Sequence, residues 1–591
     1  MMSLKSAGSS ARWSTAHSVW RGPRERVVII VASVLFAAGA LGTTITGEIY
    51  PTLPLGLVAA GIVLVAGLFH RLTTNLAIAI AIVLGAGYRV IVFLWPNSMI
   101  LMDPDTYALW SYAYLNGGLP DYVSGFYTNA SVFPVFGAEI SSMAGLDVAS
   151  AYVVFPLIVG VLLPLAAALI VKRVVGEGSI APAIAAFVAA FDPASVRFSY
   201  APVPLALAAV FIALAFIGYL VLIDEYDTVR SKSRLGAFVL ISTLSVAAAL
   251  THKIPLAVFA IFLWSAFVVA IAMRGEFVGR KGALLLFGVV AVVTHWTFLT
   301  DYLARAAVLM GDILTADVAL ADPATSNEYY RSYNPDFFRS LRNIFYMPLV
   351  LTIAGIAWLG VFIRRSSFSK GSSVAVLLGG AAGSVIFILP GKFISEAPGF
   401  QRVFVYGTAI IAALVGIGVA RILSRRVPES GLSARKLLVG TILVTILITQ
   451  AFSAPATPDF ADGPRLYLTE QEIATKSFSQ EHVDDVVRMD VYLADEVVDF
   501  EYESGIPRQY ETVPKPEEQT ELMSEEYLNG TLPERNYPYV THRETRVYRL
   551  SSEVILTWDV TGYLDAEYSR YYDSGPAHSY YRNTDEAADT A

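Results

Sequence analysis

Two closely spaced carboxylates, followed by aromatic residues, stand out in the segment 102–120. Asp103 and Asp105 begin this segment, and aromatic residues follow at helical spacing, namely Tyr107, Trp110 and Tyr114. A carboxylate can take a proton from a hydroxyl group, which is the task of a general base. The same residues also have a structural explanation, because Asp-Pro-Asp favours a helix start and aromatic residues collect at membrane surfaces. The sequence leaves both explanations open.

Basic residues gather at the ends of apolar runs. Arg89 lies inside such a run, where an ionisable group is costly enough to indicate a function. The others stand at run ends, and they are Arg197, His252, Lys253, Lys392 and Arg402. Cationic groups in this position suit an anionic lipid phosphate, although long basic side chains also reach headgroups without any further role. Asp105 and Asp192 could together bind a divalent cation, Mg²⁺ or Mn²⁺.

The composition sets the class of protein that must position these groups. Of 591 residues, 55% are hydrophobic, 16% are charged and none is cysteine. We predict an α-helical polytopic membrane protein of about thirteen transmembrane helices, since many apolar runs can cross a bilayer. The run at 179–191 is the shortest, with Tyr200 as an alternative end. The predicted spans are 27–47, 52–70, 74–96, 149–171, 179–191, 203–223, 235–250, 255–272, 282–300, 345–363, 372–390, 403–420 and 437–452.

The distribution of Lys and Arg predicts the orientation. With the N-terminus inside, the inner segments carry 22 of these residues and the outer loops of the membrane part carry 8. We therefore expect a basic cytoplasmic segment at 1–26, a membrane domain at 27–451 and an outer catalytic loop at 97–148. We also expect the segment 452–591 to lie on the outer side of the membrane.

The C-terminal segment 452–591 has a different composition. It holds 29 Asp and Glu against 11 Lys and Arg, a net charge of −18. Thr469 and Glu472 form a capping-box pattern that predicts a helix toward Val487. Strands and hairpins are predicted at 545–560 and 568–582, so we expect a small extracytoplasmic α/β or α+β domain. Its surplus acid favours a hydrated, salt-tolerant surface.

The segment GYRVIVFLWPNSMILMDPDTYALWSYAYLNGGLP resembles the start of the GT-C superfamily of membrane glycosyltransferases. In that superfamily an acidic motif in an outer loop precedes an aromatic helix. Asp192 with RFSY after it, and FQRVF around Arg402, fit the same pattern. The span number and outer C-terminal domain resemble oligosaccharyltransferases and lipid-A aminoarabinose transferases, and the acidic, cysteine-free tail resembles haloarchaeal proteins.

The sequence also departs from that superfamily. The acidic loop follows the third span, whereas in many members it follows the first. The WWDYG motif of oligosaccharyltransferases is absent, with only Thr557-Trp558-Asp559-Val560 in its place, and Thr325-x-x-Glu328 faintly resembles their T-x-x-E element. These differences favour transfer of one sugar over transfer of a whole oligosaccharide to Asn.

The resemblance implies a sugar donor linked to polyprenyl or dolichyl phosphate, used on the outer face during cell-surface glycosylation. The acceptor would be a glycan, a lipid or a protein, with membrane lipids as further partners and no nucleic acid. Asp103 would be the base and Asp105 its neighbour in the catalytic pair. Tyr107 and the groups at the span tips would bind substrate, with Arg402 and Arg89 first at the phosphate. A transporter, or a non-catalytic protein of surface assembly, is the alternative.

Overall fold

The computed structural model describes residues 22–582 with gaps. The gaps are 71, 97, 102, 118–126, 128–129, 177–178, 225–230, 275–279, 299–302, 305–307, 309–327, 333–344, 365–370, 389–399, 425–433, 454–455, 460–464, 484, 490–492, 495–519, 523, 533–536, 544–545 and 550–551. Statements about structure below refer to the described residues.

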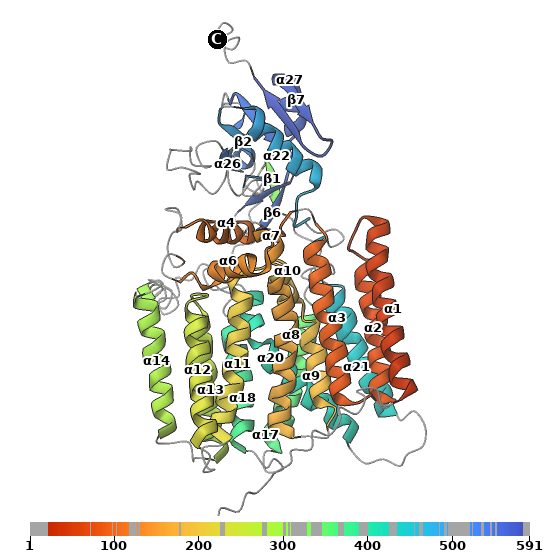
Figure 1. The fold of residues 1–591 in the computed structure, drawn as a ribbon, viewed down its shortest axis with the longest axis vertical. Coiled ribbons are helices and arrows are strands. Elements are labelled where there is room, and N and C mark those ends of the chain that lie inside the picture. Colours follow the sequence, from red (N-terminus) through yellow and green to blue (C-terminus); the bar gives the residue numbers. More distant parts are fainter. Residues whose placement is uncertain are drawn as a thin grey trace, which may run out of the picture.

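A helix occupies each of the thirteen predicted spans, and these helices stand side by side as one bundle (Figure 1). They are α1 (Pro23–Thr46), α2 (Thr52–Phe69), α3 (Thr74–Leu94), α8 (Val154–Val175), α9 (Ala181–Ala190), α11 (Pro204–Asp224), α12 (Ser231–Ala249), α13 (Pro255–Arg274), α14 (Arg280–Phe298), α17 (Tyr346–Ile363), α18 (Gly371–Ile388), α20 (Phe400–Ser424) and α21 (Ala434–Ala451). The predicted multi-pass helical class is confirmed.

Nine of these helices are long and apolar enough, over the described residues, to cross a membrane. A tenth span is formed if α9 is joined with α10 (Pro193–Tyr200), which is bent from it by 49°. The remaining three helices, α12, α14 and α18, are apolar but shorter over their described residues. The bend falls at Asp192, so the predicted short span does continue to Tyr200, but as a broken helix.

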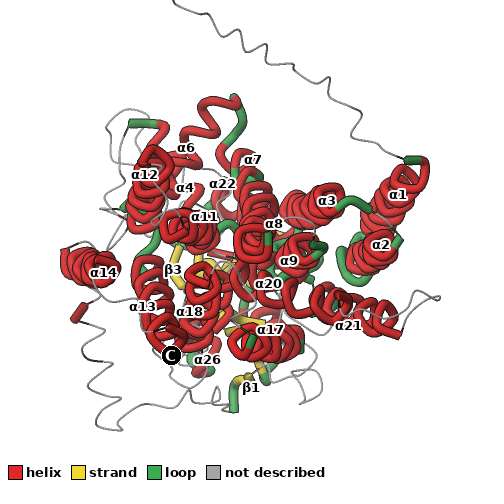
Figure 2. Tube along the Cα trace, turned by 90° about the horizontal axis from the view of Figure 1, so that it is seen from below, coloured by secondary structure: helices red, strands yellow, loops and turns green. Residues whose placement is uncertain are grey.

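Helices α8, α9 and α20 lie in the middle of the bundle, with α1 and α2 at one side and α14 at the other (Figure 2). Small residues allow α3, α8 and α9 to approach closely. A Cβ on Gly85 would stand 2.8 Å from the Ala190 carbonyl oxygen, and one on Gly160 would stand 2.7 Å from the Ala86 Cα. This close packing fixes the ends of three helices around one point, where Arg89 and Asp192 lie.

Four short helices cover one end of the bundle, between the membrane helices and the C-terminal region (Figure 1). They are α4 (Asp103–Leu115), α6 (Val132–Ala144), α7 (Val148–Ala151) and α10. Ser111 on α4 donates to the Pro134 carbonyl at 2.7 Å and lies 2.8 Å from the Tyr152 hydroxyl. We call this end of the bundle the site face.

The C-terminal region stands on the site face and contains two small sheets (Figure 1). A mixed five-stranded sheet has the order β3-β2-β4-β8-β7, and a three-stranded antiparallel sheet has the order β1-β6-β5. The strands and helices here are β1 (Tyr330–Ser332), α22 (Glu470–His482), β2 (Val487–Met489), β3 (Thr520–Leu522), α26 (Ser524–Asn529), β4 (Tyr539–His542), β5 (Arg546–Arg549), β6 (Ser552–Leu556), α27 (Val560–Glu567), β7 (Ser569–Asp573) and β8 (His578–Tyr581).

The sequence predicted the start of α22 and the strands β5 to β8, and it did not predict β1, β2, β3 or β4. The capping box of Thr469 and Glu472 is formed in both directions, and it starts α22. The predicted hairpins are β5–β6 and β7–β8. Strand β1, however, comes from the segment between α14 and α17, and Tyr330 pairs with Leu556. The three-stranded sheet therefore draws on residues outside 452–591.

Candidate active site

The segment just before α4 is held by the chain that leads into α22. Leu101 donates its N–H to the Leu466 carbonyl at 2.8 Å, and Leu468 donates its N–H to Ser98 Oγ at 2.9 Å. Leu101 has a φ of +69°, which is rare for a residue with a branched side chain. Strained backbone of this kind persists where the surroundings enforce it. These contacts thus hold the acidic segment in a defined conformation.

Asp103 and Asp105 differ in exposure although they are two residues apart. Helix α4 begins at Asp103, as the Asp-Pro-Asp pattern predicts, and Asp103 is exposed. Asp105 is 3% exposed. Only Asp103 can therefore meet a substrate directly in this conformation, and the catalytic role of either carboxylate stays a prediction.

A cluster of aromatic rings forms the wall beside Asp103. The Tyr107 hydroxyl donates to the Tyr127 hydroxyl at 3.1 Å, and the Tyr107 ring lies 5.4 Å from Trp110 and 5.3 Å from Phe133. Burial raises the pKa of Tyr107 well above its usual range and that of Tyr127 to about 12. Both hydroxyls therefore stay protonated at neutral pH, where they can serve as hydrogen-bond groups.

Arg402 faces the same two tyrosines. The charge of Asp103 adds to the raised pKa of Tyr107 and Tyr127, and the charge of Arg402 lowers both pKa values. Arg402 is exposed, on the first turn of α20. An exposed acid and an exposed guanidinium thus lie close enough to one hydroxyl pair for their charges to act on it. The roles of Asp103, Tyr107 and Arg402 in a reaction stay predictions.

His252 lies close to Arg402 but is not the cation that the sequence suggested. It is 8% exposed, in the turn between α12 and α13. Burial, followed by the charges of Lys253, Arg402 and His295, lowers its pKa to about 3. Its Nδ1 is 3.2 Å from the Tyr406 hydroxyl. His252 is therefore neutral at physiological pH, and its contribution to phosphate binding has to be that of a neutral group.

Two other predicted cations lie near these residues. Arg197 on α10 is half-buried and donates to Gln401 Oε1 at 3.3 Å, next to Arg402 in the chain. Lys253 is half-buried, and its carbonyl accepts from Trp296 Nε1 at 3.0 Å. Their substrate-binding roles stay predictions. Lys392 lies outside the described residues.

Arg89 and Asp192 form a buried network inside the bundle. Arg89 is 0% exposed and donates to the Gly85 and Ala190 carbonyls and, at 2.8 Å, to Ser195 Oγ. Asp192 accepts from the Ser195 N–H at 2.9 Å and from Thr408 Oγ1 at 3.0 Å. These bonds join α3, α9, α10 and α20. Phosphate binding by Arg89, and substrate binding by Asp192, stay predictions that this burial counts against.

The predicted cation site of Asp105 and Asp192 lacks further ligands. Among the described residues, no three His, Asp or Glu side chains are close enough to hold one metal ion. The oxygen Oδ2 of Asp192 is also shared by two hydrogen bonds inside the protein. The described residues thus do not fit a resident divalent cation, and we derive no step through one.

Glu328 and Thr557, which belong to the two faint motif matches, lie next to each other. Thr557 donates its N–H to the Tyr329 carbonyl at 2.9 Å, and its hydroxyl contacts the Glu328 carbonyl. Trp558 donates to the Tyr527 carbonyl at 3.1 Å, and Asp559 caps α27 through the Gly562 N–H at 2.9 Å. Trp558 and Asp559 therefore have structural partners, which agrees with the absence of the full motif.

Several residues of the site were not anticipated from the sequence. Tyr127, Gln401, Tyr406 and Thr408 all bond to predicted site residues. Tyr406 and Thr408 left a usable signal, because they are polar groups in the apolar run after Arg402. Ser195 stands at the third helical position after Asp192, where a capping partner is expected.

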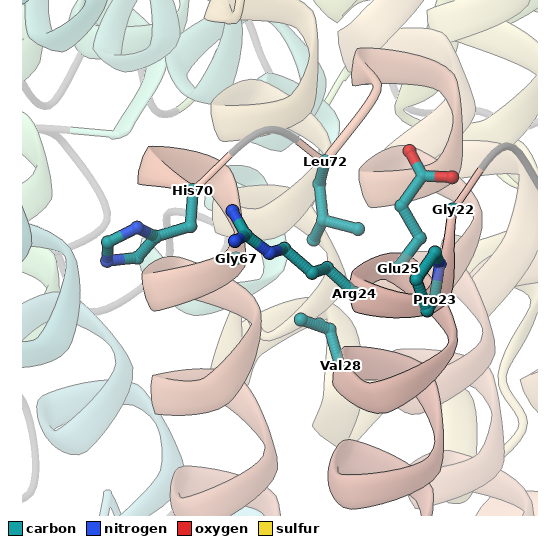
Figure 3. A pocket seen from close by; sticks show the side chains of 8 residues that line it. All are labelled: Gly22, Pro23, Arg24, Glu25, Val28, Gly67, His70 and Leu72. Atoms are coloured by element: carbon teal, nitrogen blue, oxygen red, sulfur yellow. The ribbon is translucent and has the colours of Figure 1, made fainter.

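A cavity lies at the end of the bundle opposite the site face. It has a volume of about 380 Å³ and lies between the start of α1 and the end of α2. Figure 3 shows the side chains of Arg24 and His70 on its two walls. Because α1 runs from this end toward the site face, the cavity is separated from Asp103 by the thickness of the bundle (Figure 1).

Comparison of the sequence with protein-family models gave no match, and comparison with curated proteins gave none either. The structure is similar to the archaeal oligosaccharyltransferase from Archaeoglobus fulgidus in its apo form. The TM-score is 0.51 at 13% sequence identity, over 81% of this chain and 70% of that one. The same enzyme, AglB, in complex with an inhibitory peptide and a dolichol-phosphate, matches with a TM-score of 0.52 at 13% identity, over 80% and 69%.

These similarities concern the fold. Both structures are of a GT-C glycosyltransferase, and each match covers about four fifths of this chain. The haloarchaeal source inferred from the tail stays a prediction. The chain has the GT-C fold, with a small sheet-containing region at its C-terminal end.

Proposed function

We propose that this protein is a membrane glycosyltransferase that moves one sugar from a polyprenyl-phosphate carrier to an acceptor outside the cell. One observation carries the proposal: exposed Asp103 and exposed Arg402 both face the Tyr107–Tyr127 hydroxyl pair. A base and a phosphate-binding cation on one aromatic wall are the two groups that such a transfer needs. The GT-C fold supports the general class of reaction.

The reaction assigns one role to each of these side chains. Asp103 takes the proton of the acceptor hydroxyl, whose oxygen forms the new bond to the anomeric carbon of the sugar. The bond between that carbon and the phosphate oxygen breaks, and its electron pair leaves with the lipid phosphate. Arg402 stabilises the charge that grows on this phosphate. The tyrosine hydroxyls stay protonated and bond to sugar oxygens.

The carrier lipid needs an apolar place below the phosphate. A cavity of about 440 Å³ lies between α17, α18 and α20, and it is lined by apolar side chains such as Leu351, Trp358 and Leu414. Leu414 is twelve residues beyond Arg402 on α20, which corresponds to about 18 Å along a helix. A polyprenyl chain in this cavity would bring its phosphate toward Arg402.

The orientation of the chain is part of the proposal. Figure 1 places α4, which begins at Asp103, and the C-terminal region at one end of the bundle, and the excess of Lys and Arg in the other segments favours that end as the outer one. A reporter fused after Ala591 should be exposed outside the cell, and one fused after Lys232 should be inside. Reporters on the same side would contradict the proposed orientation.

The decisive experiment combines cells and purified protein. Cells that lack the protein should accumulate unused lipid-linked sugar or carry a shortened glycan, and wild-type protein should restore the normal pattern. Asp103→Asn should fail to restore it. Glu139→Gln is the matched control, because Glu139 is an exposed acid on α6 at the same face. An unchanged lipid-linked pool in cells without the protein would overturn the proposal.

A further inference from the structure

The hydrogen bonds of His252 determine which ring nitrogen carries its proton. The Ile254 N–H points to Nδ1 at 3.4 Å, and a backbone N–H can only donate. Nδ1 must therefore accept, so the Tyr406 hydroxyl, 3.2 Å away, donates to it as well. In a neutral imidazole the proton then sits on Nε2. A charged ring would place an N–H against the Ile254 N–H.

The surroundings favour this neutral form from every side. Lys253 follows in the chain, Arg402 and Tyr406 come from α20, and His295 comes from α14. His295 is itself bonded through Nε2 to the Ala249 carbonyl at 2.9 Å. None of these neighbours is an anion that would stabilise an imidazolium. The low pKa of His252, about 3, agrees with the geometry.

Nε2 of His252 is left for a ligand. Among the described residues it has no hydrogen-bond partner, and it is not one of the fully enclosed unpartnered atoms. The charge of Arg402 acts on His252 and also on the Tyr107–Tyr127 pair, so Arg402 lies near both the ring and the aromatic wall beside Asp103. A phosphate bound to Arg402 would thus meet the open edge of the imidazole.

We propose that His252 donates a hydrogen bond from Nε2–H to an oxygen of the carrier phosphate, and that Tyr406 is the positioning residue that fixes this tautomer. The inference rests on the proposed function for the identity of the phosphate. No proton is transferred in this step: the ring keeps its N–H, and the lipid phosphate leaves with the electron pair of the broken bond. A neutral donor gives the same hydrogen bond at any physiological pH.

The tautomer can be measured without any activity. Full-length protein with ¹⁵N-labelled histidine, in detergent, should show one ring with a protonated Nε2 and an acceptor Nδ1 between pH 5 and pH 8. The signal is assigned to His252 by its absence in His252→Asn. Tyr406→Phe should convert it into a mixture of tautomers. A His252 signal with a protonated Nδ1, or a charged ring at pH 6, would overturn the inference.

Activity and phosphate binding test the donor role. Gln can place an amide N–H near the position of Nε2, whereas Asn reaches only the position of Nδ1. His252→Asn should lose about 10²–10³-fold in turnover, the usual effect of removing one such donor. His252→Gln should keep most of it, and Tyr406→Phe should lower kcat more than it raises the KM for the donor. Equal losses for Gln and Asn would contradict the donor role.

The two proposals can fail separately. Farnesyl phosphate, observed by ³¹P NMR with the full chain, reports on the phosphate site alone, and His252→Asn should weaken its binding. If wild-type protein binds farnesyl phosphate through His252 but transfers no sugar from any carrier, the proposed function fails and the site remains. If transfer occurs and binding is the same in His252→Asn, the inference fails and the function remains.

Discussion

Two combinations of an acid and an arginine lie near the same end of the bundle. They differ in how far their side chains are exposed to a ligand. Arg89 and Asp192 are buried, and their hydrogen bonds go to four helices of the protein. Asp103 and Arg402 are exposed, and the charges of both act on the Tyr107–Tyr127 pair. The first arrangement suits a lock between helices, and the second suits chemistry. Burial and partners, rather than residue type, separate the two.

Neutralising the exposed acid should have the largest effect on activity. Asp103→Asn keeps the size of the side chain and its ability to start a helix, because Asn and Asp cap comparably. Sugar transfer should fall by about 10²–10⁴-fold with unchanged expression, since a general base is lost. Initial rates with purified protein are the measurement. A fully active variant would mean that Asp103 has a structural role, as Arg89 and Asp192 do.

Removing the buried arginine should affect stability instead. Arg89→Met leaves the buried acceptors on Gly85, Ala190 and Ser195 without their donor, and each buried polar group left unsatisfied costs about 1–3 kcal/mol. Thermal unfolding in detergent should show a large drop in Tm and a low yield. Normal stability combined with lost donor binding would instead assign Arg89 to the phosphate, as the sequence alone suggested.

The exposed arginine should show the opposite profile. Arg402→Gln should unfold like the wild type, because the side chain is exposed, and it should lose about 10²–10³-fold in transfer through reduced charge stabilisation at the phosphate. The salt dependence of transfer should also weaken. A stability loss without a rate loss would make Arg402 a second structural cation.

The smallest effect is expected from removing one hydrogen bond of the Arg89–Asp192 network. Thr408→Val removes the hydroxyl that bonds Asp192 at 3.0 Å, and hydrogen bonds to carboxylates contribute about 1.5–3 kcal/mol. We expect a modest fall in Tm with nearly normal kcat. A selective loss of kcat would indicate that the Arg89–Asp192 network also sets the geometry of the active site. The structural and catalytic roles would then not be separate.

The sequence predicts the bundle well, because long apolar runs and caps are local signals. The helix start at Asp103 and the capping box at Thr469 are examples. Contacts between distant segments could not be predicted in this way. Arg89 looked like a phosphate ligand because it is ionisable and near a span end, and its three acceptors, Gly85, Ala190 and Ser195, appear only after α9 and α10 pack against α3. The state of His252 likewise depends on Tyr406, from another helix.

The pairing of β1 with β6 has a consequence for how the chain matures. Tyr330 and Leu556 are partners although they are 226 positions apart. The ribosome delivers β1 long before β6 exists, so the three-stranded sheet can form only after the membrane helices between them have been synthesised. Because contacts between such distant residues form late in folding, the presence of the sheet indicates that synthesis and folding of the chain are complete. A chain that is truncated before Ser552 would carry every membrane helix and still leave β1 without its partner strand.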